Sequence, residues 1–457
     1  MLSPDKTGLL KAFLGGLPGP IAARLAMAVE VDRLLDGHVL PHDDILESLR
    51  PILRRDQGER TATPLRLFCR PFQDLLTCAP RIGVKQKGVL TRSSLVPVWN
   101  WLAGTVLPTQ TIRYIADVKA LALAHKNDEA QACAMAFWPL AGAAMADALK
   151  GAEARKALAK ALGDPLAVED ADEMALLLCA GEAIEKLEMV LPKGTPGLNE
   201  ELLWALRAVY DELSVSHPDV ASYVAVIAMN RLNRPWEALR LPMMISRKND
   251  ETLICKTDMG LVGEILFARM DALKTSIQAT RHPLFNADVL MEEVKTFADL
   301  SSHIVKEIEL KRDGEWGKRL LSERVMIGKV MEGFMERAPR EVAAALPMQK
   351  ATGGDFSRPI GAEKQEMALR YTRLVAGCRN FAAAASFAAK QKDIYEELCA
   401  LLKRYNEDLI KALKADPSNI AATGQFEFCA GLTALLYSEE EAELLRRRGR
   451  AALAAAA

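Results

Sequence analysis

Apolar residues recur at the spacing of an α-helix along most of this chain. In residues 394–413 they form one stripe, made of Ile394, Leu398, Leu401, Tyr405, Leu409 and Leu413. A stripe with steps of three or four residues is typical of a helix that packs one face against a core. No segment shows the sustained apolar and polar alternation, bounded by Asn-Gly or Asp-Gly turns, that marks a β-hairpin. The sequence therefore predicts an all-α protein.

The length and the turn-forming residues predict several helical lobes built of αα-hairpins. The chain has 457 residues, which is more than one core normally holds. Pro and Gly cluster in residues 191–201 and 346–364, as they do in linkers. We therefore expect an N-terminal helical domain over residues 1–191, a central helical domain over 198–346 and C-terminal helical hairpins over 361–457.

One segment resembles a single helix pair of the tetratricopeptide type. The resemblance is carried by Ala228, by residues 230–233 and by the Trp-Glu-Ala-Leu run at 236–239. It implies a protein-binding helical repeat, but a second copy at the 34-residue offset of that family is not found. Two interpretations stay open, an ordinary αα-hairpin and a fold that is partly solenoid-like.

Charge is sorted along the chain. The whole protein has 59 bases and 60 acids. Residues 50–92 nevertheless hold ten bases and three acids, whereas residues 164–201 hold ten acids and two lysines. In one account, the basic region docks on the acidic helices, within the fold or across a homodimer. In the other, it binds an anion from outside the molecule.

The second account centres on residues 81–94. This segment has four bases and no acid, and it ends in two serines that are suited to cap the short helix that follows. The start of a helix offers unpaired N–H groups and the positive end of its dipole, which together favour a phosphate or carboxylate. The predicted anion-binding residues are Arg81, Lys85, Lys87, Arg92, Ser93 and Ser94.

Motifs for catalysis or metal binding are not recognisable in the sequence. It lacks GxSxG, HExxH and a complete P-loop. Asp299, His303 and Glu307 are spaced four apart and would share one side of a helix, but the lysines around them favour a charged surface over a metal site. We predict no catalytic residues, no metal and no cofactor. Whether dispersed residues form an enzyme site stays open, with the balance against it.

These features favour a non-enzymatic interaction, scaffold or regulatory protein of the cytoplasm that binds a protein partner or itself. The eight cysteines include no CxxC pair, which is typical of reduced cytosolic proteins, and no uncharged run reaches the ~20 apolar residues of a membrane span. A first alternative is an enzyme or sensor that binds a phosphorylated or carboxylated small molecule at residues 81–94. A second is nucleic-acid binding through residues 50–92, which we do not expect because aromatic residues are not interleaved with the bases.

Overall fold

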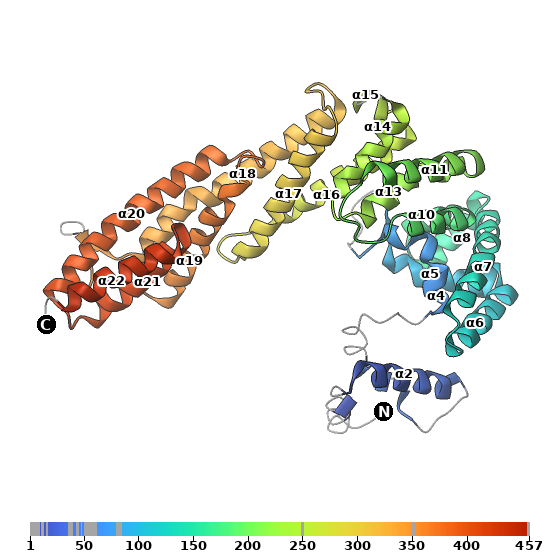
Figure 1. Cartoon of the computed structure of the whole chain (residues 1–457), viewed down its shortest axis with the longest axis horizontal. Helices are drawn as coiled ribbons and strands as arrows, with labels where there is room; N and C mark the ends of the chain where they lie inside the picture. The colour runs from blue at the N-terminus through green and yellow to red at the C-terminus, as the bar shows by residue number, and fades with distance from the viewer. Residues whose placement is uncertain are drawn as a thin grey trace. The chain divides into compact units, whose positions relative to one another are not determined.

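The computed structural model describes residues 10, 13–14, 17–34, 40–42, 45–46, 48–49, 62–78, 85–247, 251–349 and 353–454. Helices make up nearly all of the secondary structure in these residues (Figure 1). The strands are two-residue pairs. β1 (Leu76–Thr77) lies parallel to β2 (Leu90–Thr91), and β3 (Met348–Gln349) lies antiparallel to β4 (Gly353–Gly354). The prediction of an all-α protein is confirmed.

Contacts between residues divide the chain into two compact units. Unit 1 comprises Met1–Lys193 and Trp204–Asn230, and unit 2 comprises Gly194–Leu203 and Arg231–Ala457. The chain first passes from unit 1 to unit 2 inside the Pro- and Gly-rich segment 191–201. The predicted three-domain division, with a second boundary at residues 346–361, stays a prediction.

Unit 1 is built around an aromatic and aliphatic core. Trp138 is fully buried, and its indole N–H donates to the Leu67 carbonyl at 3.0 Å. The ring of Trp99 packs on Phe68 at a centroid distance of 4.9 Å. Its elements are α2 (Gly19–Leu34), α4 (Pro64–Phe68), η1 (Arg70–Leu75), β1, β2, η2 (Arg92–Ser94), α5 (Leu95–Trp101), the π-helical turn η3 (Leu102–Val106), α6 (Pro108–Leu123), α7 (Asn127–Ala148), α8 (Ala152–Leu162), α9 (Pro165–Cys179), α10 (Gly181–Val190), most of α11 (Glu200–Ser216), α12 (Pro218–Ala221) and most of α13 (Tyr223–Arg231).

Helix α9, which carries many of the acids of unit 1, begins at the pair Asp164-Pro165, which is a typical helix start. The Asp164 carboxylate accepts a hydrogen bond from the Leu166 N–H at 2.9 Å, and Pro165 is the first helical residue. Pro is favoured there because the first turn of a helix has no intrahelical partner for that N–H. This start fixes the face on which α9 presents Asp170 and Glu173.

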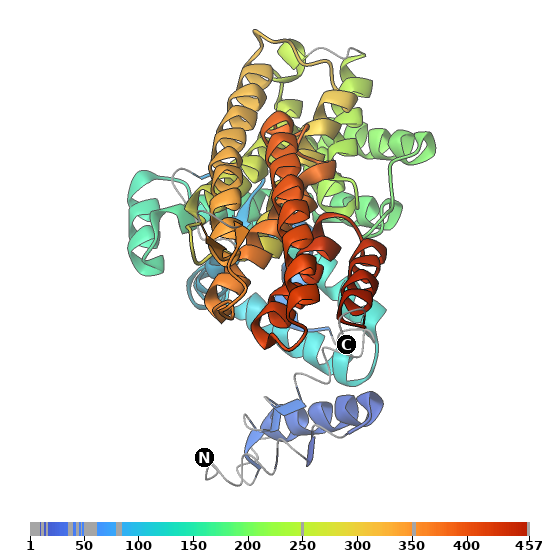
Figure 2. The same cartoon turned by 90° about the vertical axis from the view of Figure 1, so that its left-hand side faces the viewer.

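Unit 2 is a succession of longer helices. Helix α18 packs against α16, α19 and α20, while α20, α21 and α22 pack against one another (Figures 1 and 2). The elements are η4 (Pro235–Leu239), α14 (Arg240–Ser246), α15 (Glu251–Ile254), η5 (Asp258–Gly260), α16 (Leu261–Ala279), α17 (Ala287–Glu307), α18 (Glu315–Ala345), β3, β4, α19 (Ala362–Gly377), η6 (Cys378–Asn380), α20 (Ala388–Ala415), α21 (Ile420–Leu436) and α22 (Glu439–Ala454).

The apolar stripe that predicts the helix over residues 394–413 lies on the buried face of α20. Within residues 394–413 the buried positions include Leu402 instead of Leu401, and they also include the amide Asn406. Leu402 continues the step of four from Leu398, so the stripe stays on one face of the helix. Asn406 interrupts that face with a polar group.

The segment that resembles a tetratricopeptide helix pair forms α13, η4 and α14. Its second part begins at Pro235 with a turn of 3₁₀ helix. Trp236 of this turn stacks on the His303 ring with centroids 4.1 Å apart. Membership in a repeat array stays a prediction.

The described residues include no single helix with both the length and the apolar composition needed to cross a membrane. Helices α7 and α8 meet these criteria only as a pair, which is bent by 109°.

A carboxylate in the core of unit 2 makes stability depend on pH. Glu323 of α18 is 3% exposed and lies 3.4 Å from the Arg319 guanidinium, but burial and the nearby Asp271 raise its pKa to about 7. The folded protein therefore keeps this proton over a range in which an unfolded glutamate loses it. The contribution of Glu323 to stability is complete below the ordinary pKa of 4.5 and declines as pH rises toward 7.

Between pH 4.5 and 8, the free energy of unfolding of wild type should fall by about 3 kcal/mol more than that of Glu323→Gln. The variant lacks this pH dependence because a glutamine cannot ionise. Urea denaturation of both proteins across this range measures the difference. Parallel pH profiles for the two proteins would contradict the assignment.

Candidate functional site

Lys85, the centre of the predicted anion-binding segment, forms its ion pairs with residues of unit 1. Its side chain is 9% exposed, and its Nζ forms ion pairs with the Glu173 carboxylate and, at 3.3 Å, with Asp170 Oδ1. The same ammonium donates to the carbonyls of Gln86 and Val89 at 2.9 and 2.5 Å. Lys85 therefore fastens the basic segment to α9.

The two acids of α9 collect further donors. Asp170 is fully buried and accepts from the Ser94 hydroxyl at 2.7 Å. Glu173 accepts from the Gly88 N–H and from the Tyr223 hydroxyl, each at 2.5 Å. Burial and the Glu173 charge raise the pKa of the Tyr223 phenol. The result is a buried ionic network that joins the segment around β2 to α9 and α13.

The other predicted residues have different positions. Arg81 lies outside the described residues, as do the bases between residues 50 and 61. Lys87 is exposed, with its ammonium 5.2 Å from the centre of the Tyr223 ring. Arg92 and Ser93 are exposed on η2. Ser94 occupies the N-cap position of α5, but its hydroxyl bonds to Asp170 and not to the helix.

A base of the N-terminal region contacts the acidic helices of unit 1 at a second position. Arg70 of η1 contacts the Glu185 carboxylate at 2.5 Å and the Glu188 carboxylate at 3.6 Å, both on α10. Together with Lys85, this is the arrangement of the first account, in which bases of the N-terminal region dock on the acidic helices within the fold. The binding of an outside anion by residues 81–94 stays a prediction.

Asp299, His303 and Glu307, which share one side of α17, also make contacts within the protein. The Arg240 guanidinium holds Glu307 through two hydrogen bonds of 2.7 and 2.6 Å. His303 contacts the Asp299 carbonyl through Nδ1 at 2.7 Å and stacks on Trp236. In the described part of the chain, no three His, Cys, Asp or Glu side chains are arranged as metal ligands.

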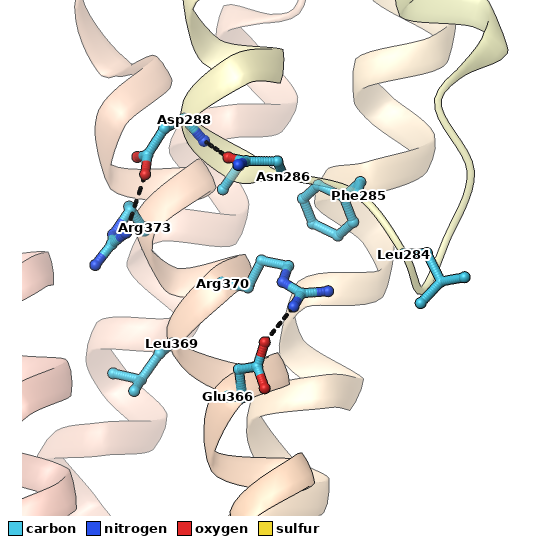
Figure 3. A pocket seen from close by; sticks show the side chains of 9 residues that line it. Leu284, Phe285, Asn286, Asp288, Glu366, Leu369, Arg370 and Arg373 are labelled. Atoms are coloured by element: carbon cyan, nitrogen blue, oxygen red, sulfur yellow. Dashed lines mark hydrogen bonds and ion pairs between the residues drawn. The ribbon is translucent and has the colours of Figure 1, made fainter. Parts of the chain in front are cut away.

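Unit 2 contains an open pocket that the sequence did not indicate. We call it the α17–α19 pocket, and its volume is about 440 Å³. The segment that leads into α17 and one face of α19 form its walls (Figure 3). It is lined by Leu284, Phe285, Asn286, Ala287, Asp288, Glu366, Leu369, Arg370 and Arg373.

Local sequence fixes the first wall of this pocket. The Asn286 side chain accepts from the N–H groups of Asp288 and Val289 at 2.9 and 3.3 Å, which caps α17. Phe285, just before the cap, is 3% exposed, and its ring lies 4.9 Å from that of Phe334. Leu284, the residue before Phe285, is 90% exposed.

Two arginines form the second wall. Arg370 and Arg373 lie three residues apart on α19, so they share one side of the helix. Arg370 donates to the Pro283 carbonyl at 2.7 Å and to Glu366 at 2.5 Å, and its guanidinium lies 5.7 Å from the centre of the Phe285 ring. Arg373 donates to Asp288 at 3.1 Å.

The solvent exposure of the charged side chains in the pocket determines whether a ligand can bind the two arginines. The two acids, Glu366 and Asp288, are 71% and 64% exposed, whereas the Arg370 side chain is 23% exposed. Exposed ion pairs contribute only about 0–1 kcal/mol each, so a carboxylate from another molecule can replace either acid at small cost. The pocket thus offers two cationic groups beside an apolar surface of Leu284 and Leu369.

No known protein family matches this chain. The curated proteins and the solved structures likewise contain no match.

A sequence signal for the α17–α19 pocket exists, although it is weak. Glu366 and Arg370 have the spacing of a helical ion pair, and Asn286 before Asp288 suits a helix start. Neither pattern predicts that residues 284–288 lie beside residues 366–373. That contact joins segments about eighty residues apart, and it depends on how α17 and α19 pack.

Proposed function

We propose that this is a non-enzymatic interaction protein whose α17–α19 pocket binds an acidic and apolar segment of a partner protein. The observation that carries the proposal is the pair Arg370 and Arg373 on one side of α19, next to the apolar surface of Leu284 and Leu369. A guanidinium forms planar two-point hydrogen bonds with a carboxylate. A short segment with two acids around a leucine matches both features.

The chemistry of the pocket favours a peptide over a small polar anion. The exposed Leu284 offers apolar area that a phosphate would leave in water, whereas a leucine side chain would cover it. The pocket is open, as a site for a passing chain segment needs to be, and its volume of about 440 Å³ lies within the range of ligand pockets.

The remaining parts of the proposal rest on the sequence. We place the protein in the cytoplasm because its eight cysteines are scattered without CxxC pairs. A scaffold role, in which a partner protein or a second copy of this chain is bound through helical surfaces, is compatible with the helix pair at residues 228–239. Its resemblance to a tetratricopeptide unit supports that role only as an analogy.

An array of nine-residue peptides tests the pocket. Each peptide has a central leucine flanked by two acids at varied spacing, and matched peptides carry glutamine and asparagine in place of the acids. We expect the acidic peptides to bind and Arg370→Glu/Arg373→Glu to weaken binding at least tenfold, because both cationic groups become repulsive. Fluorescence anisotropy with the best peptide measures the affinity.

The matched control reverses two bases elsewhere on unit 2. Arg404→Glu/Lys411→Glu makes the same change in net charge on exposed positions of α20, outside the pocket. This variant should bind the peptide within twofold of wild type. Equal losses in both double variants, or no binding by any acidic peptide, would refute the proposal.

A further inference from the structure

A second cavity in unit 2 lies between α20, the end of α21 and α22, and has a volume of about 320 Å³. Its apolar lining consists mainly of leucine and isoleucine side chains from α20 and α22. These are Leu402, Ile410, Leu444 and Leu445. We call it the α20–α22 cavity. At the lower end of the usual size range of ligand pockets, it suits a small molecule.

One buried polar group lines this cavity and lacks a partner. Asn406 of α20 is 9% exposed, and its Oδ1 accepts no hydrogen bond from any described residue. A buried carbonyl oxygen left without a donor is costly for a protein, so such groups normally have partners. Asn406 therefore points to a ligand that brings an N–H or O–H donor.

Charged groups lie at the rim of the cavity. Lys403 and Glu407 come from α20, and Glu441 and Arg448 come from α22. None of the four forms an ion pair within the described residues, although their neighbours Glu443 and Arg446 do. The rim thus keeps charges of both signs available for a ligand.

Glu441 and Arg448 lie seven residues apart on α22. The Tyr395 hydroxyl near the start of α20 donates to the Leu436 carbonyl at the end of α21, so α22 starts beside the start of α20 and runs the same way. The backbone of Glu441 therefore lies nearer the start of α20, and that of Arg448 nearer its end. Seven residues of helix span about 10 Å, which is about the length of three extended residues.

We propose that the α20–α22 cavity binds a short apolar peptide, of two or three residues, as a free zwitterion. The ammonium faces Glu441, the carboxylate faces Arg448, and a peptide N–H donates to the Asn406 oxygen. The apolar side chains pack on the leucines of α20 and α22. This site is separate from the α17–α19 pocket and does not depend on its function.

Calorimetric titration with Leu-Ala-Leu tests the assignment. We expect saturable binding that falls at least tenfold when the peptide is N-acetylated and at least tenfold when its carboxylate is amidated, because each change removes one charge. Equal affinity for the free and capped peptides, or no binding of the free peptide, would overturn the proposal.

Variants locate the binding in the cavity. Asn406→Leu keeps the size of the side chain and removes the unpaired carbonyl, so the protein should melt at the same or a higher temperature and bind Leu-Ala-Leu at least tenfold more weakly. Arg448→Glu should also lose tenfold. Arg404→Glu, on α20 between the lining residues Lys403 and Asn406 but not itself part of the lining, should bind within twofold of wild type. Wild-type affinity in the Asn406 and Arg448 variants would overturn the assignment.

Discussion

Replacing Lys85 with methionine should lower the free energy of unfolding by about 3–5 kcal/mol, the range measured when one partner of a buried ion pair is removed. The Lys85 ammonium is the positive charge between Asp170 and Glu173, which are 0% and 7% exposed. Without it, two buried carboxylates of like sign face each other. Urea denaturation measures the loss, and hydrogen exchange should rise in α9 and in the segment around β2.

Lys87 provides the matched control. It lies two residues further on, is exposed, and contacts only the face of the Tyr223 ring among the interactions described here. A contact of this kind contributes about 0.5–1 kcal/mol at an exposed site, so Lys87→Met should cost no more than that. Similar losses for the two methionine variants would show that Lys85 is not the centre of a buried network.

A second replacement in the network checks the cause. In Lys85→Met/Glu173→Gln, only Asp170 remains charged, so the like-charge repulsion disappears. The double variant should therefore be more stable than the sum of the two single effects predicts, by at least about 1 kcal/mol. Strict additivity would contradict an electrostatic coupling between these side chains.

Glu251→Ala should destabilise unit 2 by at least about 4 kcal/mol. This carboxylate is 1% exposed and accepts from the backbone N–H groups of Lys311, Trp316 and Gly317, at 2.9, 2.7 and 3.2 Å. Two of these donors belong to the first turn of α18, where negative charge also interacts favourably with the helix dipole. Hydrogen bonds to a charged group contribute about 1.5–3 kcal/mol each, and alanine leaves all three donors without this acceptor.

Local exchange distinguishes this effect from a general loss of packing. The amides of residues 311–317 should exchange faster in Glu251→Ala, while Glu251→Gln, which keeps an acceptor oxygen, should lie between alanine and wild type. Glu315→Ala is the control because Glu315 is an exposed acid in the same turn, and it should cost about 0.5 kcal/mol. A larger effect of Glu315 than of Glu251 would contradict this role.

The sequence was sufficient to predict features that depend on short-range patterns. The helix over residues 394–413 follows from its apolar spacing, and α9 starts at Pro165 because Asp164 caps it. Asn406 can also be recognised in the sequence, because it is an amide four residues after Leu402 in an otherwise apolar stripe. These features depend on residues within one or two helical turns.

Features that depend on tertiary packing were only partly predictable. The excess of bases in 50–92 and of acids in 164–201 favoured a contact between the two regions, but it did not identify which residues pair. Lys85 is 88 residues from Glu173, and Arg370 is 87 residues from Pro283. Such pairs follow from the packing of whole helices, which a single sequence does not specify locally.

The most direct test of the proposed function removes the acids that compete for the two arginines. In Asp288→Asn/Glu366→Gln, Arg370 and Arg373 lose their carboxylate partners in the pocket but keep their charge. The best acidic peptide from the array should then bind roughly three- to tenfold more tightly by fluorescence anisotropy, because two exposed ion pairs no longer have to be broken. Unchanged or weaker binding would contradict the claim that this pocket recognises an acidic segment.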